Sequence, residues 1–406
     1  MPPEGEFAFN ILTTTNSNWD IFFSWWRGLI KGKTEPDEAI MRKVDEFIKG
    51  LNSRRAKIEV LFDFVKREIR YVSISLGKSG YEPTPAKEVF ENKYGDCKDK
   101  STLLISMLSA AGIPAHYVLI PTHYSGKLIK DIPFPFQFDH CIVAAEGKDG
   151  YLFLDPTVEE CRFGYLPACD QNRDVLIFKD HEVLFARTPV EEPQASGKFS
   201  RQAIRIERDG SIEVSATDTY AGDFESFRRW FYINNSPTEI REMFENRVDW
   251  ISAGAKLIEY SHSDPLNFKE QFYERLKYYA PDHCQRAQDI LTFRIPGIWS
   301  ICPESGKKER RYPLDIWRRD YRNHKVEITV PEGYKVYHLP KPIDLQCPYF
   351  EFRSSYSKED GKVFYKQEFI QKATRISPEE YPSYRKFCKE MEKTSEKQTI
   401  FFIKKR

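Results

Sequence analysis

The chain has 406 residues, of which 40% are hydrophobic and 30% charged, a composition typical of a globular protein long enough for two or three domains. Its 62 lysines and arginines almost balance 61 aspartates and glutamates, so a net charge of +1 creates no overall field for nucleic acid or anionic membranes. No stretch approaches the ~18 apolar residues of a membrane-spanning helix, and the 8 scattered cysteines contain no C-x-x-C pair. The sequence therefore indicates no transmembrane segment, zinc ribbon or disulfide framework.

The first hundred residues are predicted to be mainly helical. Trp19, Phe22, Phe23 and Trp26 recur with helical spacing, and we interpret them as a face that packs on a core rather than as a ligand site. Further predicted elements are helices at 37–51 and 56–70, a short strand at 71–76 and a helix at 86–92.

The stretch Tyr94-Gly95-Asp96-Cys97-Lys98-Asp99-Lys100 places one cysteine at the predicted start of a helix that continues to residue 111. Gly95 permits a tight turn, and Asp96 can cap the first turn of the helix. Free N–H groups and the helix dipole favour thiolate over thiol at this position. Cys97 is therefore a candidate nucleophile, and the alternative is a small buried cysteine at the start of a core helix.

Three strands and a long loop are predicted after this helix. A strand at 115–120 precedes a loop at 121–137, whose length indicates either function or mobility. Strands at 138–145 and 151–155 then form a hairpin.

The hairpin places His140 and Asp155 on one face if its turn centres on residues 147–148. In this register His140 lies directly opposite Asp155, with Cβ atoms about 4.5–5.5 Å apart, and Ile142 lies opposite Phe153. A slip of one residue would send His140 and Asp155 to opposite faces of the hairpin.

These three residues can perform nucleophilic catalysis together. The Cys97 thiolate would attack a carbonyl carbon, while His140 would hold the cysteine proton and later protonate the leaving amine. Asp155 would accept a hydrogen bond from the other ring nitrogen and so fix the tautomer of the histidine. Each residue alone is weak evidence, and their order along the chain makes the combination informative.

Residues 56–160 resemble the transglutaminase-like core, the branch of the papain-like cysteine enzymes whose catalytic residues follow the order Cys, His, Asp. The matching segments are Tyr94–Lys100, Ala111–Ala115, Asp139–His140 and Leu154–Thr157. The resemblance implies an α+β fold with helices packed on a small antiparallel sheet, with Cys97 as nucleophile, His140 as general base and acid, and Asp155 as its orienting group. It does not specify the reaction, because members include cross-linking acyltransferases, peptidases, amidases and inactive relatives.

The groups that would stabilise an oxyanion are only partly identified. The backbone N–H of Cys97 is the natural first donor. Tyr71, Tyr81 and Tyr94 are candidates for a second, side-chain donor. No cluster of carboxylates resembles a calcium loop, so we expect no metal and no cofactor.

The C-terminal half is predicted to be rich in strands. A linker at 188–198 precedes a hairpin at 199–216 around an Asp-Gly turn, and a helix is predicted at 224–253. The remaining predicted elements are strands at 326–328, 334–337, 349–354 and 363–370, a helix at 378–395 and a strand at 399–403.

We expect three domains: a transglutaminase-like core at 1–187, a mixed α/β domain at 199–320 and a β-rich, sandwich-like domain at 321–406. The Gly-Asp-Cys-Lys-Asp form and the segments Arg311–Leu314 and Val330–Tyr334 resemble bacterial multidomain members with β-rich domains around the core. Such relatives usually carry a large β domain before the core. Because this chain starts without one, we expect a fragment or a shortened member.

The expected function is that of a thiol-dependent enzyme acting on an amide or peptide carbonyl of a protein or peptide, by hydrolysis or by transfer to an amine. The alternative is a catalytically silent scaffold that binds protein or glycan. A loop 121–137 that filled any cleft at Cys97 would favour this alternative. The basic, aromatic segment 307–319 is interpreted as a solvated strand edge, so no nucleic-acid partner is expected. The bacterial resemblance points to the cell envelope or periplasm, and the oligomeric state does not follow from the sequence.

Overall fold

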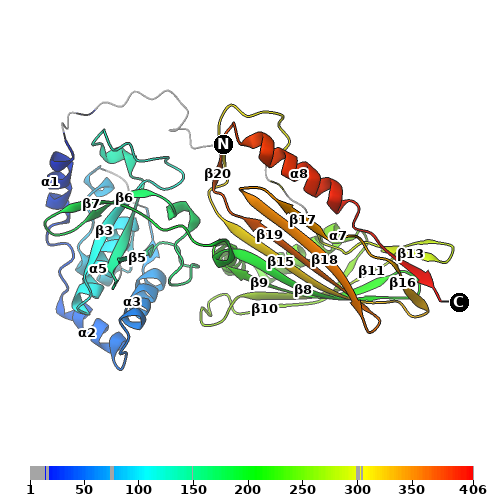
Figure 1. Cartoon of the computed structure of the whole chain (residues 1–406). Helices are drawn as coiled ribbons and strands as arrows, with labels where there is room; N and C mark the ends of the chain where they lie inside the picture. The colour runs from blue at the N-terminus through cyan, green and yellow to red at the C-terminus, as the bar shows by residue number, and fades with distance from the viewer. Residues whose placement is uncertain are drawn as a thin grey trace. The chain divides into compact units, whose positions relative to one another are not determined.

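The computed structural model describes residues 14, 18–73, 77–148, 150–298, 302 and 305–405 (Figure 1). The chain divides into two compact units between Glu191 and Glu192, and each unit is described by itself. Helices and strands are both abundant, which confirms the predicted α+β class. Within the described residues, no helix is both long enough and apolar enough to cross a membrane.

The N-terminal unit consists of helices packed against one five-stranded sheet, together with a small two-stranded sheet. In chain order its elements are α1 (Trp19–Ile30), α2 (Glu38–Ile48), α3 (Arg54–Glu68), β1 (Arg70–Tyr71), η2 (Gly77–Gly80), α4 (Ala86–Asn92), β2 (Tyr94–Gly95), α5 (Cys97–Ala110), β3 (Ala115–Ile120), η3 (Pro135–Gln137), β4 (His140–Glu146), β5 (Tyr151–Leu154), η4 (Ala168–Asp170), β6 (Asp174–Phe178) and β7 (Val183–Arg187). The sheet order is β5-β4-β3-β6-β7, and each neighbouring pair is antiparallel.

Helix α5 is the centre of this unit (Figure 1). It contacts β3 and β4 of the sheet on one side and α2, α3 and α4 on the others. Nearly every residue of α5 is consequently buried, including the polar side chains of Ser101, Thr102 and Ser106. The residue at its N-terminus, Cys97, is therefore attached to the most firmly packed element of the unit.

The predicted helices of this unit are confirmed with shifts of a few residues at their ends. The aromatic face of α1 packs inward as expected, because Phe22 and Trp26 are buried in the main core. The predicted strand at 71–76 is shorter: β1 ends at Tyr71 and pairs in parallel with β2. Residues 74–76 of that prediction lie outside the described residues.

The hairpin of β4 and β5 has a different register from the predicted one. Val143 pairs with Leu154, whereas its predicted partner is Leu152. A hydrogen bond from the Gly147 N–H to the Gly150 carbonyl (2.7 Å) closes the turn and centres it one residue later than predicted. Partners along β5 are therefore displaced by two residues, a shift that leaves each residue on its predicted face.

The C-terminal unit is built on one long eight-stranded sheet, with a four-stranded sheet and a small two-stranded sheet beside it. Its elements are η5 (Pro193–Ala195), β8 (Gly197–Ile206), β9 (Ile212–Ala221), α6 (Asp223–Asn234), α7 (Pro237–Ile251), β10 (Lys256–His262), β11 (Tyr273–Ala280), β12 (Gln285–Ala287), β13 (Ile290–Phe293), β14 (Leu314–Asp315), β15 (Asp320–Thr329), β16 (Tyr334–His338), β17 (Ile343–Gln346), β18 (Phe350–Glu359), β19 (Lys362–Gln371), β20 (Arg375–Ile376), α8 (Tyr381–Ser395) and β21 (Ile400–Lys404). The large sheet has the order β10-β11-β9-β8-β15-β19-β18-β17, and the four-stranded sheet has the order β12-β13-β21-β16.

We expected two domains in this region, divided at 320/321. In the structure both segments belong to one compact unit. Strands β8 and β15 are adjacent and parallel in the large sheet, although they come from the two segments that were expected to be separate domains. One hydrophobic core contains Ile204, Val326 and Phe402. Alternation along a strand predicts which face is buried, but it does not identify the neighbouring strand, so the sequence pattern could not locate this boundary.

The single helix predicted at 224–253 is two helices. Helix α6 ends at Asn234, and α7 begins at Pro237. The Ser236 side chain caps α7 and forms a reciprocal capping box with Glu239. Proline is favoured in the first turn of a helix and disrupts a helix interior, which explains the break.

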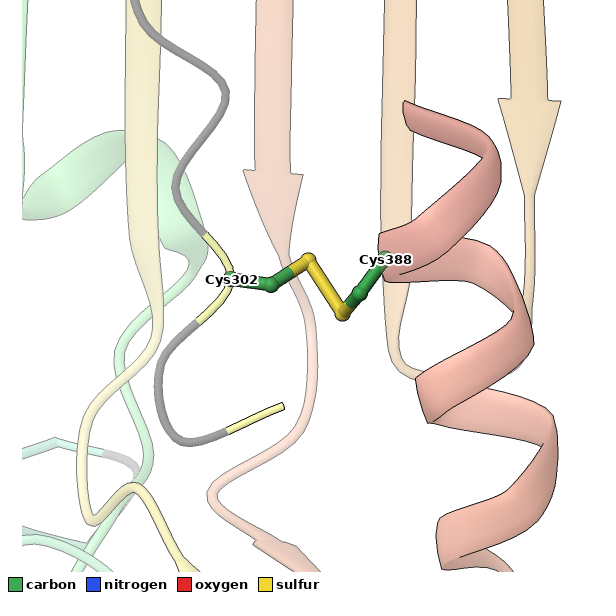
Figure 2. The surroundings of a disulfide bond; sticks show 2 residues. All are labelled: Cys302 and Cys388. Atoms are coloured by element: carbon green, nitrogen blue, oxygen red, sulfur yellow. A yellow bond between two sulfur atoms is a disulfide. The ribbon is translucent and has the colours of Figure 1, made fainter. Parts of the chain in front are cut away.

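A disulfide joins Cys302 to Cys388 of α8 (Figure 2), with their Cα atoms 5.6 Å apart. It links the segment before β14 to the core that α8 forms with Phe350 and Phe352. The two cysteines are separated by 86 residues in the sequence, so no local spacing could have indicated the bond. The sequence analysis indicated no disulfide framework and therefore missed this bond.

Candidate functional site

The Gly95–Lys100 motif builds the N-terminus of α5. The Asp96 carboxylate accepts the backbone N–H groups of Lys98 (3.0 Å) and Asp99 (3.2 Å), and Asp99 returns the interaction by accepting the N–H of Asp96 (3.1 Å). This reciprocal pair is a capping box, and it fixes the first turn of the helix. Gly95 is required here, because a Cβ atom at this position would lie 2.5 Å from the Cβ of Asp99.

The two lysines of the motif also have structural partners. Lys98 is buried and forms an ion pair with Asp96. The Lys100 ammonium donates to the carbonyls of Lys66 (3.1 Å) and Ile69 at the end of α3. Cations are favourable at helix C-termini, so Lys100 joins the end of α3 to the start of α5 and fixes the backbone on which Cys97 stands.

His140 and Asp155 come together at the ends of the hairpin strands. His140 is the first residue of β4, and Asp155 follows the last residue of β5. The prediction that they lie directly opposite each other is wrong because of the two-residue shift, but they remain diagonal neighbours on one face. The His140 Nε2 atom lies 3.2 Å from Asp155 Oδ2, and His140 lines the same cavity as Cys97. The structure thus brings all three predicted site residues together.

The electrostatics of the pair favour a charged histidine. Burial alone would lower the pKa of His140, but the Asp155 carboxylate and the hydrogen bonds to Asp155 and Cys97 outweigh it, so this pKa is raised well above its usual value. Burial likewise opposes ionisation of Asp155, yet His140 and Thr157 stabilise the carboxylate and lower its pKa to about 2. Asp155 is therefore ionised at neutral pH and can stabilise an imidazolium.

Asp170 is a second buried carboxyl at this site, and the sequence analysis did not identify it. It ends η4, is completely buried, and its carboxyl lies beside that of Asp155. Burial and the Asp155 charge raise the pKa of Asp170 well above its usual value, which favours a protonated group able to donate to Asp155. No spacing pattern marks Asp170, because a loop after β5 brings it to the site.

A cavity of about 140 Å³ opens beside Cys97 and His140. Its aromatic walls include Phe22, Trp26 and Phe138, and Pro135 contributes from the loop 121–137. The loop therefore borders the space at Cys97 without filling it. A loop that filled the space would have favoured the silent scaffold, so this feature gives that alternative no support.

The loop 121–137 is held by specific hydrogen bonds near this cavity. Asp139, the neighbour of His140, accepts the Thr122 N–H (2.7 Å) and the Thr122 hydroxyl (2.6 Å) at the beginning of the loop. The Gln137 amide bonds the backbone of Ile129 and Ile132 near the end of the loop. The loop thus has a defined conformation on the rim of the cavity.

The three tyrosines proposed as oxyanion donors differ in position. Tyr71 and Tyr81 line the cavity, whereas Tyr94 is not among the lining residues. Burial, followed by the nearby Cys97 group, raises the pKa of Tyr71, so its hydroxyl stays protonated and close to the sulfur. Cys97 is the first residue of α5, and its N–H group donates to no protein acceptor within the described residues.

His140, Asp155 and Asp170 also form the one group within the described residues that could hold a metal ion, with ligand atoms within 4.8 Å of one another. The hydrogen bond between His140 and Asp155 and the contact between the two carboxyls already account for this proximity. We therefore interpret the group as a hydrogen-bonded pair, His140 and Asp155, with the Asp170 carboxyl beside it.

Comparisons with protein families match both units of the chain. A family model described as the transglutaminase-like superfamily matches residues 42–156, which contain Cys97, His140 and Asp155. A second model, described as a domain of unknown function, matches residues 293–401. A search of curated proteins found no match.

Two solved structures show similarity to the chain. A "putative protease" from Parabacteroides distasonis is 13% identical with a TM-score of 0.57, and the match covers 94% of this chain and 58% of that one. This chain thus spans 58% of the length of that protein, and the two share a fold. A "putative cysteine protease" from Cytophaga hutchinsonii is 17% identical over 38% of this chain and 48% of that one, with a TM-score of 0.25 that carries no argument.

Proposed function

Residues 42–156 belong to the transglutaminase-like superfamily, and from this premise we propose that the protein is a thiol-dependent enzyme that attacks an amide or peptide carbonyl through Cys97. The observation that carries the proposal is that Cys97 and His140 line one open cavity, with His140 hydrogen-bonded to the buried Asp155. The substrate is a protein or peptide, and the acyl group leaves by hydrolysis or by transfer to an amine.

In the proposed first half-reaction, the Cys97 sulfur forms a bond to the carbonyl carbon and the C=O π electrons move to oxygen. Because Nε2 of His140 is bonded to Asp155, Nδ1 is the ring nitrogen that holds the cysteine proton. When the tetrahedral intermediate collapses, the C–N bond breaks and the imidazolium gives this proton to the leaving amine. The product is a thioester on Cys97 and a neutral histidine.

In the proposed second half-reaction, water or an amine attacks the thioester. His140 removes the proton of the attacking group, and the C–S bond breaks to release an acid or a new amide. The proton then returns to the Cys97–His140 pair. Asp155 stays ionised throughout, since its low pKa keeps the proton on the imidazole.

The developing oxyanion would be stabilised by two donors. The Cys97 N–H supplies the first, at the positive end of the α5 dipole. We assign the second to the Tyr71 hydroxyl, because Tyr71 lines the cavity and lies near both Cys97 and His140. A cavity of about 140 Å³ with aromatic walls suits one side chain of the substrate beside the reacting carbonyl.

The disulfide supports a location for this reaction. Disulfides persist in oxidising compartments and are rare in the cytosol, so the Cys302–Cys388 bond favours the envelope location expected from the bacterial resemblance.

The proposal is tested by trapping the thioester. The full chain is incubated with a panel of peptide 4-nitrophenyl esters, and the acyl adduct is located by peptide mass spectrometry. We expect the adduct on Cys97, absent in Cys97→Ala and strongly slowed in His140→Ala, but unchanged in Cys347→Ala, which removes another partly buried free cysteine. The reaction is then repeated with glycine methyl ester present as a competing amine. Release of the free acid indicates hydrolysis, and formation of the glycine amide indicates transfer. If Cys97 is acylated no faster than Cys347, the silent-scaffold alternative is favoured instead.

A further inference from the structure

Three aromatic side chains contact one another in a row beside the cavity at Cys97. Trp25 of α1 meets Tyr81 with ring centroids 5.4 Å apart, and Tyr81 meets Phe136 of η3 with centroids 5.8 Å apart. Both contacts are edge-to-face, which is a favourable geometry for aromatic pairs. Together, Trp25, Tyr81 and Phe136 are called the aromatic rim.

The aromatic rim adjoins the space in which the proposed reaction takes place. Tyr81 lines the cavity together with Cys97 and His140. Pro135, the neighbour of Phe136 in the chain, lines the same cavity. A peptide whose carbonyl group lies at Cys97 therefore has its adjacent side chains near the rim.

Two rings of the rim are exposed, although aromatic residues near them in the chain are not. Trp25 is 41% exposed, and Phe136 is 70% exposed. Trp26, by contrast, is buried in the core of the unit, and Phe138 packs against that core. A single exposed apolar side chain is ordinary, but a contiguous group of exposed rings beside a cavity is typical of a binding surface.

The two sides of the rim are held together by contacts between α1 and the loop 121–137. The indole N–H of Trp19 donates to the Lys130 carbonyl in this loop (2.6 Å). The Phe22 ring of α1 stacks on Phe138, directly after the loop, with centroids 6.1 Å apart. The rings of the rim are therefore positioned before a ligand arrives, and a positioned surface loses less conformational entropy on binding.

The charged side chains that line the cavity already have partners. Apart from His140, they are Asp96, Lys98 and Asp139. Asp96 and Lys98 form an ion pair with each other. Asp139 accepts the N–H (2.7 Å) and the hydroxyl (2.6 Å) of Thr122. A charged side chain of a ligand would have to displace one of these partners, whereas an aromatic ring requires only apolar contact with the rim.

We propose that the aromatic rim binds an aromatic side chain of a peptide, adjacent to the residue whose carbonyl lies at Cys97. The inference rests on the proposed function, because it places the peptide in the cavity at Cys97, but the binding itself requires no reaction. It narrows the substrate class to peptides and proteins that carry an aromatic residue beside the amide that is attacked. Trp25, Tyr81 and Phe136 are then residues that determine specificity.

The test is equilibrium binding of the blocked peptide Ac-Gly-Phe-Gly-NH₂, measured by calorimetry on the full chain carrying Cys97→Ala, which consumes no peptide. Matched peptides carry Ala, Leu, Lys or Glu in place of Phe. We expect the Phe peptide to bind about tenfold or more tightly than the Ala, Lys and Glu peptides, and about threefold more tightly than the Leu peptide. A Phe peptide that binds no better than the Ala peptide up to about 10 mM overturns the proposal. Equal binding of the Leu and Phe peptides overturns the aromatic assignment.

Variants of the rim locate the binding site. Phe136→Ala and Trp25→Ala each remove one exposed ring, and each should reduce the preference for the Phe peptide over the Ala peptide to less than about threefold. Phe136→Tyr keeps the ring and should keep the preference. Phe227→Ala is the matched control, because Phe227 is 61% exposed on α6 of the C-terminal unit. An unchanged preference in both alanine variants of the rim contradicts the assignment.

Binding and acylation separate this inference from the proposed function. A preference for the Phe peptide supports the rim even if Cys97 of the wild type is never acylated, and the rim then belongs to a silent scaffold that binds peptides. Acylation of Cys97 by esters without any preference in binding overturns the rim and leaves the proposed function intact.

Discussion

The Nε2 atom of His140 lies 3.2 Å from Asp155 Oδ2, although the two residues are not a direct pair of the β4–β5 hairpin. Asp155 stands one position beyond the end of β5, where its other oxygen, Oδ1, accepts the N–H (2.9 Å) and hydroxyl (2.7 Å) of Thr157. The carboxylate is thus held from two sides. One oxygen is fixed by Thr157, and the other is directed at the histidine.

This relationship predicts a large effect of Asp155→Asn. The amide can still accept from Thr157 through its oxygen, but its NH₂ group would face His140 Nε2 and favour the wrong tautomer. We expect acylation of Cys97 to fall by roughly 10³–10⁴-fold, as in other triads. The measurement is the single-turnover rate with an ester substrate. Asp174→Asn removes a carboxylate of the same unit that pairs with Arg187, and its rate should match the wild type.

The assignment of Tyr71 as an oxyanion donor is tested by Tyr71→Phe. Loss of one donor typically lowers kcat by about 10²–10³-fold, and the alkylation of Cys97 should stay within a factor of about two, because no oxyanion forms in alkylation. Tyr94→Phe is the matched control: Tyr94 lies on the paired strand β2 and is 44% exposed, against 42% for Tyr71. Equal acylation rates for the two variants would remove Tyr71 from this role.

Asp170 should leave a signature in the pH dependence of stability. Because its pKa is raised in the folded state, the stability that it contributes is fully present below about pH 4 and is lost as the pH rises through the folded pKa. Asp170→Asn removes this loss. The free energy of unfolding of the variant, relative to the wild type, should therefore increase between pH 4 and neutrality in urea titrations.

Asp174→Asn provides a control with the opposite sign. Partial burial opposes ionisation of Asp174, but Arg187 and Lys130 outweigh it and lower its pKa. Its contribution to stability is present above its unfolded pKa and lost in acid, so this variant should lose stability relative to the wild type as the pH rises from the acid range. A flat or falling difference for Asp170→Asn would contradict a protonated Asp170.

The disulfide predicts a stability effect confined to the C-terminal unit. Opening a loop of 86 residues by Cys388→Ser should cost about 4–5 kcal/mol by the chain-entropy argument, as an upper figure. Thermal unfolding measures the loss, and non-reducing mass spectrometry verifies the bond. Cys347→Ser changes a free cysteine packed against the same core and should cost far less. The alkylation rate of Cys97 should be the same in both variants, and equal melting temperatures would show that the bond is not structural.

Local signals in the sequence were sufficient to predict the start of α5, where Cys97 lies. Gly95, Asp96 and Cys97 are adjacent in the chain, and capping and turn formation depend on neighbouring residues. The faces of β4 and β5 were also predictable, because alternation survives a two-residue shift. The exact pairing was not, since the Gly147–Gly150 hydrogen bond decides where the turn centres.

The features that the sequence did not predict depend on distant residues. Asp170 reaches Asp155 through a loop, and Cys302 reaches Cys388 across a long segment. The neighbours β8 and β15 are likewise far apart in the chain. Local periodicity carries no information on such pairings, which explains why the division of the C-terminal half was the weakest part of the sequence analysis.

The most direct measurement of the central claim is the rate of Cys97 alkylation by iodoacetamide as a function of pH, in the wild type and His140→Ala, with the labelled peptide identified by mass spectrometry. The raised pKa of His140 predicts an imidazolium beside the sulfur, so labelling should stay fast below about pH 7 and lose this plateau in the variant. Labelling that rises only near pH 8.5, equally in both proteins, would mean an ordinary thiol and would contradict the account.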